Sequence, residues 1–291
     1  MLLWALLVGL SFPAVGLMSE LPPLSLTALR FAVACAGLWW LARRADGFLP
    51  SWRLLPLYML MGLCLAGFFG AMFWAAHHAT ALSMATLYVT VPLMAYLMGL
   101  GFRVEGLNWQ LPLILAIGAF GALALAFAEA LSHGEGLQLG VGEAVFFLGC
   151  VSSALYPVLS KWGLARKRLP ESAAVRTFWS LGLGGVAIGL LGLVIEPATQ
   201  LVAMRWQDFT LVVYLGLFSS ALTFWLMQRA TSVLTPGAVT AYGYMVPFVS
   251  MLLLFATAPE QMGWHWLPGS ALVLIAIGLL LRQGGKEEEA R

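Results

Sequence analysis

The chain has 291 residues, of which 61% are hydrophobic and only 10% are charged, and its mean hydropathy is +0.90. A water-soluble protein of this length needs more charge to cover its surface, so the composition excludes that class. The formal net charge of +2, with basic residues scattered from loop to loop, argues against a nucleic-acid partner. The chain is therefore expected to be an all-α integral membrane protein with the lipid bilayer as its solvent.

Ten apolar stretches follow one another along the chain, and each approaches the roughly 20 residues that a helix needs to cross a bilayer. They cover residues 2–18, 24–42, 55–76, 81–102, 111–128, 142–161, 173–195, 209–229, 237–256 and 267–281. The first is expected to be a transmembrane helix and not a signal peptide, because no basic region precedes it and a second apolar run follows at once. The short connections make neighbouring helices antiparallel.

Basic residues concentrate in alternate loops between these stretches. One set of loops and the C-terminal tail carry Arg43, Arg44, Arg53, Arg103, Lys161, Arg166, Lys167, Arg168, Arg229, Arg282, Lys286 and Arg291. The opposite loops carry Arg205 and otherwise acids and histidines, namely Glu20, His77, His78, Glu129, Glu135, Glu196, Asp208 and Glu260. Because Lys and Arg favour cytoplasmic loops, we expect a multi-pass inner (plasma) membrane protein with both termini cytoplasmic.

The positions of the tryptophans and cysteines agree with the ten apolar stretches. The tryptophans at the ends of stretches are expected to anchor the helices at the membrane–water interfaces. They are Trp52, Trp109, Trp162, Trp206, Trp264 and Trp266. Cys35, Cys64 and Cys150 lie inside apolar stretches, so they are interpreted as small apolar residues without a disulfide or metal-site pattern.

The two halves of the chain resemble each other in an ordered series of matches. Pro92 matches Pro247, each in the middle of its stretch, and Glu105 and Glu260 each follow thirteen residues later. Further matching pairs are Trp109 and Trp264, Phe73-Trp74 and Phe224-Trp225, Ala79-Thr80 and Ala230-Thr231, Pro13 and Pro157, and Arg30 and Arg176. The series indicates an internal duplication.

Each copy contains five stretches, and an odd number places the second copy upside down relative to the first. Two inverted five-helix repeats are typical of secondary transporters, whose binding site lies between the repeats near the bilayer midplane. The predicted organisation is a first repeat at 1–131, an outer connecting loop at 132–141, a second repeat at 142–283 and a polar cytoplasmic tail at 284–291.

Three groups of residues carry a resemblance to a known family: Gly9-Leu10-Ser11-Phe12-Pro13, Ala28-Leu29-Arg30-Phe31, and a mid-stretch Pro followed by Glu105 or Glu260. They resemble the EamA-like drug/metabolite transporter superfamily over nearly the whole chain. Among its members, the aromatic content and loop lengths are similar to those of the YddG-type aromatic amino acid exporters. The resemblance implies ten helices in two inverted repeats, alternating access and export of small metabolites. The segment Gly101-Phe102-Arg103-Val104 departs from the plain helix end expected there.

Tyrosines and threonines near the middle of two matching stretches are the predicted substrate contacts. Tyr88, Pro92 and Tyr96 share one helical face, and Thr240, Tyr244 and Pro247 share a face of the matching helix. Hydroxyl groups in hydrocarbon favour a partner or a water-lined cavity, and a cavity of aromatic rings and hydroxyls suits a zwitterion with an apolar side chain. The alternative is helix packing, with Ser and Thr bonded to carbonyls four residues earlier.

The prolines are interpreted as points where helices kink. Pro92 and Pro247 are expected to free the carbonyls of Tyr88 and Gly243, which could receive a substrate ammonium group. A kink satisfied by a neighbouring helix is the alternative. Pro13 and Pro157 are predicted hinges, or kinks without that role.

Aromatic and charged residues toward the ends of the stretches complete the predicted site. Trp74, His77, His78 and Trp225 are included among the substrate-binding residues, although the two histidines also fit wetted interface residues. Lys161 fits either snorkelling to the interface or attraction of a substrate carboxylate. For Arg30 and Arg176, pairing near a helix end is weighed against substrate contact. Gly182, Gly185 and Gly189 line one face of a helix and predict close packing, within the bundle or at a dimer seam.

No catalytic signature occurs, and the stretches contain no mid-membrane Asp or Glu. We therefore expect a non-enzymatic exporter of small organic solutes, with amino acids bearing aromatic or other large apolar side chains as the substrates. No cofactor or metal is expected, and the chain is expected to be a monomer or a weak homodimer. The alternatives are an exporter of other metabolites or drugs, a membrane-embedded enzyme acting on lipid-soluble substrates, and a channel or receptor-like protein.

Overall fold

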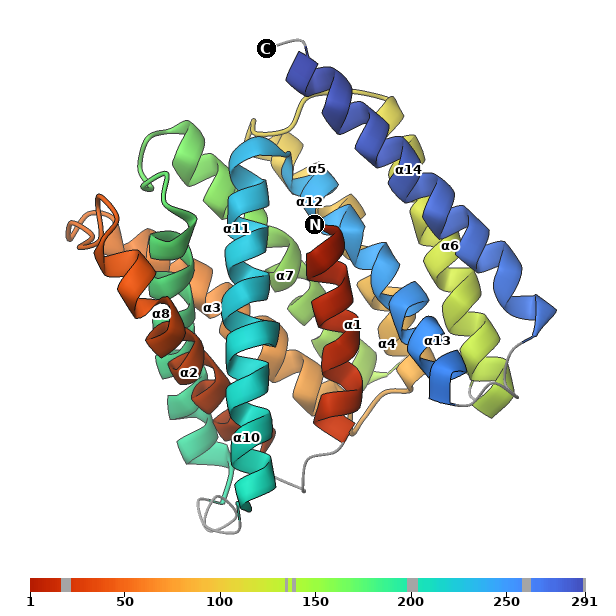
Figure 1. Ribbon diagram of the computed structural model, residues 1–291, viewed down its shortest axis with the longest axis horizontal. Coiled ribbons are helices and arrows are strands. Elements are labelled where there is room, and N and C mark those ends of the chain that lie inside the picture. The colour runs from red at the N-terminus through yellow and green to blue at the C-terminus, as the bar shows by residue number, and fades with distance from the viewer. Residues whose placement is uncertain (17–21, 134–135, 138–139, 198–203, 258–262, 290–291) are drawn as a thin grey trace.

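The computed structural model describes residues 1–16, 22–133, 136–137, 140–197, 204–257 and 263–289, and every regular element in these ranges is a helix (Figure 1). The elements in chain order are α1 (Leu2–Gly16), α2 (Pro23–Arg43), α3 (Leu55–Ala75), α4 (Ala81–Tyr88), α5 (Val91–Gly101), α6 (Gln110–His133), α7 (Val141–Ala165), α8 (Ala173–Ile195), α10 (Trp206–Tyr214), η1 (Leu215–Leu222), α11 (Thr223–Val233), α12 (Pro236–Ala241), η2 (Tyr242–Tyr244), α13 (Met245–Thr257), η4 (Trp264–Trp266) and α14 (Leu267–Glu289).

Helix length and hydropathy identify a multi-pass membrane protein. Within the part of the chain that the structure describes, nine helical stretches are long and apolar enough to cross a membrane. Ten were predicted. The first of them, α1, has 15 described residues and would span about 22 Å, short of a hydrocarbon core of about 30 Å. Its predicted bounds extend to residue 18, outside the described range.

Prolines and hydroxyl caps define where many helices begin. Pro23, Pro56, Pro92 and Pro236 each lie in the first turn of their helix, where a missing N–H is no loss. At the start of α4, the side chain of Thr80 accepts a hydrogen bond from the backbone N–H of Ser83, and Ser172 caps α8 in the same way. The starts of these helices therefore depend on the residues at those positions and not on distant parts of the chain.

Two predicted continuous helices are interrupted, which corrects the interpretation of Pro92 and Pro247 as mid-helix kinks. The stretch at 81–102 consists of α4 and α5, and the residues between them are Val89 and Thr90. The stretch at 237–256 consists of α12, a 3-10 turn at η2, and α13. Pro92 therefore lies just inside a new helix, and Pro247 is the third residue of α13.

A third departure from regular α-helix lies between α10 and α11. Residues Leu215–Leu222 form the π-helical segment η1, so the predicted stretch at 209–229 changes its helical pitch midway. The π-helix is a rare conformation that is frequently found at functional sites. Because the π-turn is wider, the residues of η1 that point toward neighbouring helices differ from those that would do so in an α-helix.

Glycines allow the helices to cross at close range. A Cβ atom built at Gly62 of α3 would lie 2.7 Å from the backbone nitrogen of Gly184 in α8, and one built at Gly121 of α6 would lie 2.8 Å from the backbone nitrogen of Val273 in α14. Figure 1 shows α6 beside α14 along one edge of the bundle and α2 crossing α8 at the other. These contacts hold the two halves of the chain together.

The glycines of α8 pack within the bundle. Cβ atoms built at Gly182, Gly185 and Gly189 would lie 3.6, 3.1 and 3.2 Å from side chains of α2. The prediction of close packing is confirmed, with α2 as the partner.

Helix α5 ends in a tight cap that explains its departure from the expected pattern. Arg103 has a φ of 57°, and the N–H of Val104 donates to the carbonyl of Gly99 over 2.9 Å. Lys167, with a φ of 53°, closes α7 in the same way. Both are left-handed helix C-caps formed by non-glycine residues.

Most of the predicted tryptophan anchors lie on the surface. Trp52, Trp109, Trp206 and Trp264 are exposed, as a residue at the membrane–water interface is expected to be. Trp266 is only 5% exposed and packs edge-on against Phe255, so its predicted role as an anchor is wrong. The 3-10 turn of η4 directs its ring into the core beneath α14.

Candidate functional site

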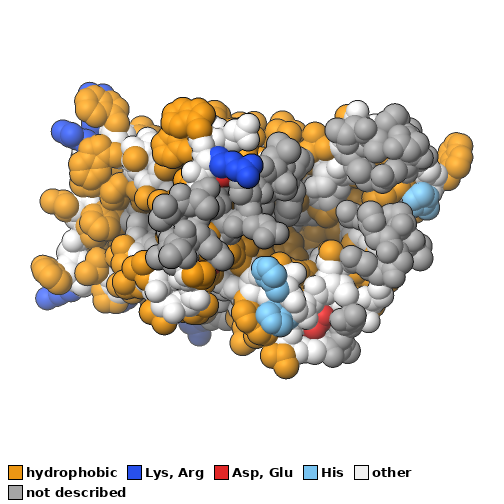
Figure 2. Space-filling model, turned by 90° about the horizontal axis from the view of Figure 1, so that it is seen from below, with side chains coloured by type: hydrophobic (Ala, Val, Ile, Leu, Met, Phe, Trp, Pro, Cys, Tyr) orange, Lys and Arg blue, Asp and Glu red, His pale blue; other side chains and the backbone are white. Residues whose placement is uncertain are grey.

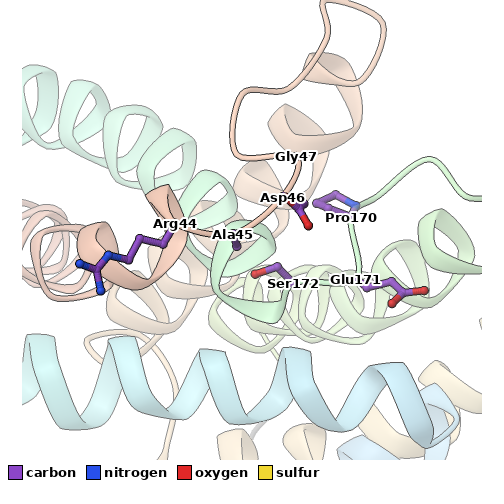
Figure 3. Close-up of a pocket in the computed structure, with 7 residues that line it drawn as sticks. All are labelled: Arg44, Ala45, Asp46, Gly47, Pro170, Glu171 and Ser172. Atoms are coloured by element: carbon purple, nitrogen blue, oxygen red, sulfur yellow. The ribbon is translucent and has the colours of Figure 1, made fainter.

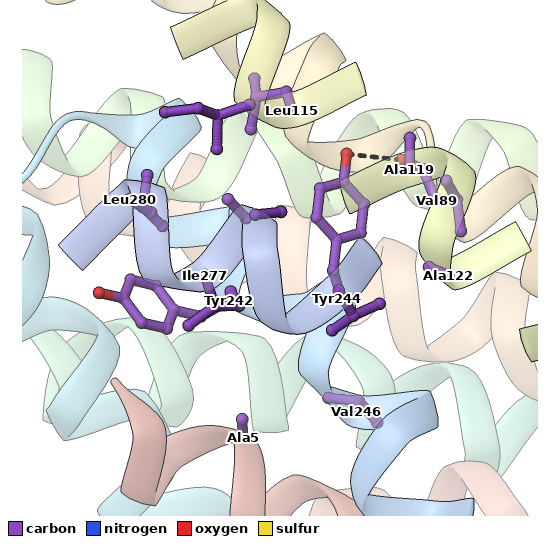
Figure 4. Close-up of a cluster of buried hydrophobic side chains, with 14 of the residues drawn as sticks. Ala5, Val89, Leu115, Ala119, Ala122, Tyr242, Tyr244, Val246, Ile277 and Leu280 are labelled. Carbon is purple, nitrogen blue, oxygen red and sulfur yellow. Dashed lines mark hydrogen bonds between the residues drawn. The ribbon is translucent and has the colours of Figure 1, made fainter. Parts of the chain in front are cut away.

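The interruptions in the two matching helices meet inside the bundle. The hydroxyl of Tyr244 donates to the carbonyl of Val89 over 3.2 Å, and both residues are buried (Figure 4). The ring centre of Tyr88 lies 5.9 Å from that of Phe68. A Cβ atom built at Gly243 would lie 3.8 Å from the Cε1 atom of Tyr88. Non-helical backbone at this depth is tolerated where it is buried in protein or lines a cavity.

The tyrosines and threonine of these helices fulfil packing roles in the described conformation. The hydroxyl of Tyr96 donates to the carbonyl of Asn108 over 3.5 Å, and its backbone lies against Gly237. Thr240 donates to the carbonyl of Pro236 four residues earlier, over 2.9 Å. The ring of Tyr244 lies against Gly118 of α6. Tyr88 is the half-buried member of the set, and its ring lies beside that of Phe68 in α3.

Trp74, His77 and His78 form a separate group at the end of α3. The rings of Trp74 and His78 stack at 4.0 Å, and the Nδ1 atoms of His77 and His78 lie 3.0 and 2.8 Å from the carbonyls of Phe73 and Trp74. All three side chains are exposed, and Figure 2 shows histidines gathered on this face of the molecule beside hydrophobic side chains. The structure does not bring this group together with Tyr96 and Thr240, because α3 ends at the opposite end of the bundle from the start of α12 (Figure 1).

A cavity of 630 Å³ lies at the other end of the bundle, between the α2–α3 and α7–α8 loops (Figure 3). Its lining mixes both charges with small residues, namely Arg44, Ala45, Asp46, Gly47, Pro170, Glu171 and Ser172. A neighbouring cavity of 280 Å³ is lined in part by Trp225 and Arg229, whose guanidinium carbon lies 5.5 Å from the indole. Of the predicted site residues, Trp225 lines this smaller cavity.

The predicted hinges lie within continuous helices. Pro157 is buried inside α7, which runs without interruption from Val141 to Ala165. Pro13 lies within α1, and its side chain falls outside the described residues. Lys161, near the end of α7, donates to the carbonyl of Ser232 over 3.2 Å. Glu260, the matching partner of Glu105, is likewise outside the described part of the chain.

An aromatic cluster between α2, α3, α7 and α11 was not singled out from the sequence. The rings of Phe31 and Phe69 meet at 5.4 Å, and Phe224 lies 6.3 Å from each of them. Tyr156 lies 6.0 Å from Phe224, and Phe73 stacks on Phe69 at 6.3 Å. Phe73 and Phe224 are only half-buried, so the cluster has an open side. These residues come from both halves of the chain.

Arg30 places its guanidinium at the edge of this aromatic cluster. The side chain is 5% exposed, and its Cζ atom lies 5.9 Å from the ring centre of Phe69. Its Nη2 atom donates to the hydroxyls of Ser219 and Ser220 in η1 over 3.3 and 3.4 Å. The sequence signal was an arginine inside an apolar stretch, for which pairing near the helix end was weighed against substrate contact.

Arg176, the residue that matches Arg30, is fully embedded in hydrogen bonds. Its Nε atom donates to Oε1 of Gln228 over 2.9 Å, and its Nη2 donates to the Gln228 carbonyl over 2.6 Å. Its Nη1 donates to the carbonyls of Pro170 and Glu171, both over 2.7 Å. Ser160 also donates to Oε1 of Gln228, over 2.5 Å. Arg176 therefore ties α8 to α11 and to the preceding loop, as expected for pairing near a helix end.

Comparisons with known proteins agree with this architecture. Residues 140–282 match the model of the EamA-like transporter family. The uncharacterized transporter YcxC of Bacillus subtilis (strain 168) is 24% identical over 290 residues, which cover 95% of this chain and 89% of that protein.

A solved structure, described as the crystal structure of a protein, has the same fold. It superimposes with a TM-score of 0.79 at 20% identity and covers 98% of this chain and 96% of its own. The apolar helices identify a multi-pass membrane protein, and its residues 140–282 are similar to the EamA-like transporter family.

Proposed function

We propose that the protein exports small organic solutes by alternating access, and that its substrates are amino acids with aromatic or other large apolar side chains. The aromatic cluster of Phe31, Phe69, Phe73, Tyr156 and Phe224 carries this proposal, because it lies between helices of both halves and keeps an open side. Flat apolar rings there suit an aromatic side chain by stacking and edge-on contact. Tyr88, which faces Phe68, extends the aromatic surface toward the helix interruption.

Alternating access follows from the proposed inverted repeats at 1–131 and 142–283. Two glycine contacts between the proposed repeats support them. Gly62 in the third helix of the first repeat packs on the backbone of the second helix of the second, α8. Gly216, in the third span of the second repeat, packs in the same way on the second helix of the first, where a Cβ would lie 3.0 Å from the Arg30 carbonyl. Interrupted helices near the midplane are typical of such transporters, and rocking of one repeat against the other opens each side in turn.

The proposed orientation puts both termini in the cytoplasm of a cell whose inner membrane holds the protein. Arg44→Cys and Arg166→Cys, in a background without the three native cysteines, are expected to label only from the inside. His77→Cys and Gln207→Cys should label from the outside, and all four positions are exposed. The measurement is modification by a membrane-impermeant maleimide in intact and in permeabilised cells. Labelling of Arg44→Cys or Arg166→Cys in intact cells would contradict the orientation.

Transport of aromatic amino acids is tested by counterflow into liposomes that contain the purified protein. Labelled phenylalanine is expected to accumulate against unlabelled phenylalanine, whereas labelled glutamate is not. Phe224→Ala removes a ring that contacts three others. A loss of about 1–3 kcal/mol of binding free energy should raise the half-saturating concentration of phenylalanine by about 5- to 150-fold. Phe120→Ala is the matched control, because its ring is 68% exposed on the outside of the bundle.

Two results would contradict the proposal in different ways. Wild-type liposomes that exchange no aromatic amino acid would remove the substrate class. If Phe224→Ala exchanges phenylalanine as well as Phe120→Ala does, the aromatic cluster contributes to helix packing and not to substrate binding.

A further inference from the structure

Arg30 carries a charge into the apolar interior and has no acidic partner among the described residues. Its side chain is 5% exposed, and its Nε atom is buried and has no hydrogen-bond partner among the described residues. No carboxylate in the described part of the chain pairs with it; its side-chain partners are the two serine hydroxyls. Charged residues inside membrane helices are costly, and those that occur mark substrate or ion pathways.

The unpaired Nε of Arg30 lies on the same edge of the guanidinium as Nη2. Nε and Nη2 share the edge through which arginine binds a carboxylate with two parallel hydrogen bonds. On Arg30 this edge has a vacant Nε and two long bonds from Nη2, at 3.3 and 3.4 Å, to hydroxyls that can also donate. Of the two serines, Ser219 is half-buried and Ser220 is fully buried.

In Arg176, the residue that matches Arg30, the Nε–Nη2 edge is occupied by partners within the protein. On Arg176 the same Nε and Nη2 atoms are held at 2.9 and 2.6 Å by the side chain and the carbonyl of Gln228. Gln228 comes three residues after Trp225, and the residue three after the matching Trp74 is His77. The Nδ1 atom of His77 bonds to the carbonyl of Phe73 at the exposed end of α3. The first half therefore lacks the amide that completes the second.

We propose that the Nε–Nη2 edge of Arg30 binds the carboxylate of the transported solute, with the hydroxyls of Ser219 and Ser220 beside it. Phe69, whose ring centre lies 5.9 Å from the guanidinium carbon, and Phe224 receive the apolar part. A single arginine edge with two hydroxyls matches one planar, singly charged group, so the ligand class is an aromatic or large apolar monocarboxylate. This inference rests on the proposed function and names the group by which that site recognises its substrate.

Binding of three related ligands to the purified protein separates the carboxylate from the amine. Phenylalanine carries both groups, 3-phenylpropionate only the carboxylate, and phenethylamine only the ammonium. The wild-type protein is expected to bind the first two and to bind phenethylamine more weakly by about tenfold or more. Arg30→Met should weaken the binding of both carboxylates by about 10- to 100-fold, and Arg30→Lys by less, because it keeps a charge without the fork. Arg43→Met, at the exposed end of α2 and outside both cavities, is the matched control and should bind as the wild type does.

Thermal unfolding without ligand shows whether Arg30 is a binding or a structural residue. Among the described residues, Arg30→Met breaks no ion pair and leaves no carboxylate unpaired, so its melting temperature should equal or exceed that of the wild type. Added 3-phenylpropionate should raise the melting temperature of the wild type and of Arg43→Met but not that of Arg30→Met.

Three results would overturn the inference: equal binding of 3-phenylpropionate by Arg30→Met and the wild type, a wild-type preference for phenethylamine, or no wild-type binding of any of the three ligands. Counterflow decides the proposed function separately. If 3-phenylpropionate binds in an Arg30-dependent way while no amino acid is exchanged, the carboxylate site stands and the amino acid assignment fails. If amino acids are exchanged equally by Arg30→Met and the wild type, the function stands and the site fails.

Discussion

Replacing Arg176 with methionine is expected to destabilise the protein by about 3–5 kcal/mol, because it removes the donor at the centre of a buried hydrogen-bond network. The change leaves Oε1 and the carbonyl of Gln228, and the carbonyls of Pro170 and Glu171, without their arginine partner. Those acceptors join α8, α11 and the α7–α8 loop. The expected result in detergent is a clear fall in melting temperature, followed by intrinsic tryptophan fluorescence, with loss of the monodisperse peak in size-exclusion chromatography.

Arg30→Met is the matched control for this variant, since it makes the same chemical change at the matching position. It should melt at or above the wild-type temperature, and Arg176→Lys should fall between the two because one ammonium group can replace some of the donors. Equal melting temperatures for Arg176→Met and Arg30→Met would show that the network around Gln228 does not contribute to stability.

Substitution of Gly62 is expected to separate α3 from α8. A Cβ atom there would lie 2.7 Å from the nitrogen of Gly184 and 3.0 Å from the carbonyl oxygen of Ser180, and both are backbone atoms that cannot rotate away. Gly62→Ala should therefore cost about 1–3 kcal/mol of stability, and Gly62→Val more. The readouts are the melting temperature in detergent and the yield of folded protein from the membrane.

Gly278→Ala provides the control for the loss of a helical glycine. A Cβ at Gly278 in α14 would meet no atom within 4 Å, so the helix gains rigidity at no steric cost. Its stability should be unchanged or higher by up to about 1 kcal/mol. A Gly62→Ala protein as stable as Gly278→Ala would mean that the crossing of α3 and α8 can widen freely.

The membrane class, the apolar stretches and the main helix ends could be predicted because each depends on local composition. Pro23, Pro56 and Ser172 mark helix starts by their own chemistry, wherever the rest of the chain lies. The interruption at Val89 and Thr90 could not be predicted in the same way. Val89 and Thr90 lie inside one long stretch, Pro92 fits a kink there as well as a helix start, and the break is stabilised by Tyr244, which lies 155 positions further along the chain.

The candidate site shows the same limit. Tyr96 and Tyr244 are predicted together as substrate contacts, yet in the folded chain the hydroxyl of Tyr96 donates to the carbonyl of Asn108 and that of Tyr244 to the carbonyl of Val89. The charge of Arg30 could be found in the sequence, but its meaning depends on its unpaired Nε and on the lack of an acidic partner among the described residues, which are properties of the packed bundle. The spacing of residues along one helix does not show which groups of a neighbouring helix will bond to their side chains.

The π-helical segment η1 has a consequence for aligning this chain with its relatives. A π-helix closes its hydrogen bonds over five residues instead of four, and a one-turn π-bulge corresponds to an extra residue within an α-helix. A gap of one residue opposite Leu215–Leu222 in a relative would therefore mark a change from π to α pitch and not a loop. Because the wider turn takes up the extra residue, the positions after the gap keep their orientation, and Trp225, Gln228 and Arg229 would face the same neighbours in both proteins. An alignment without the gap would place every residue beyond 222 one position out of register, which is about 100° around the helix axis.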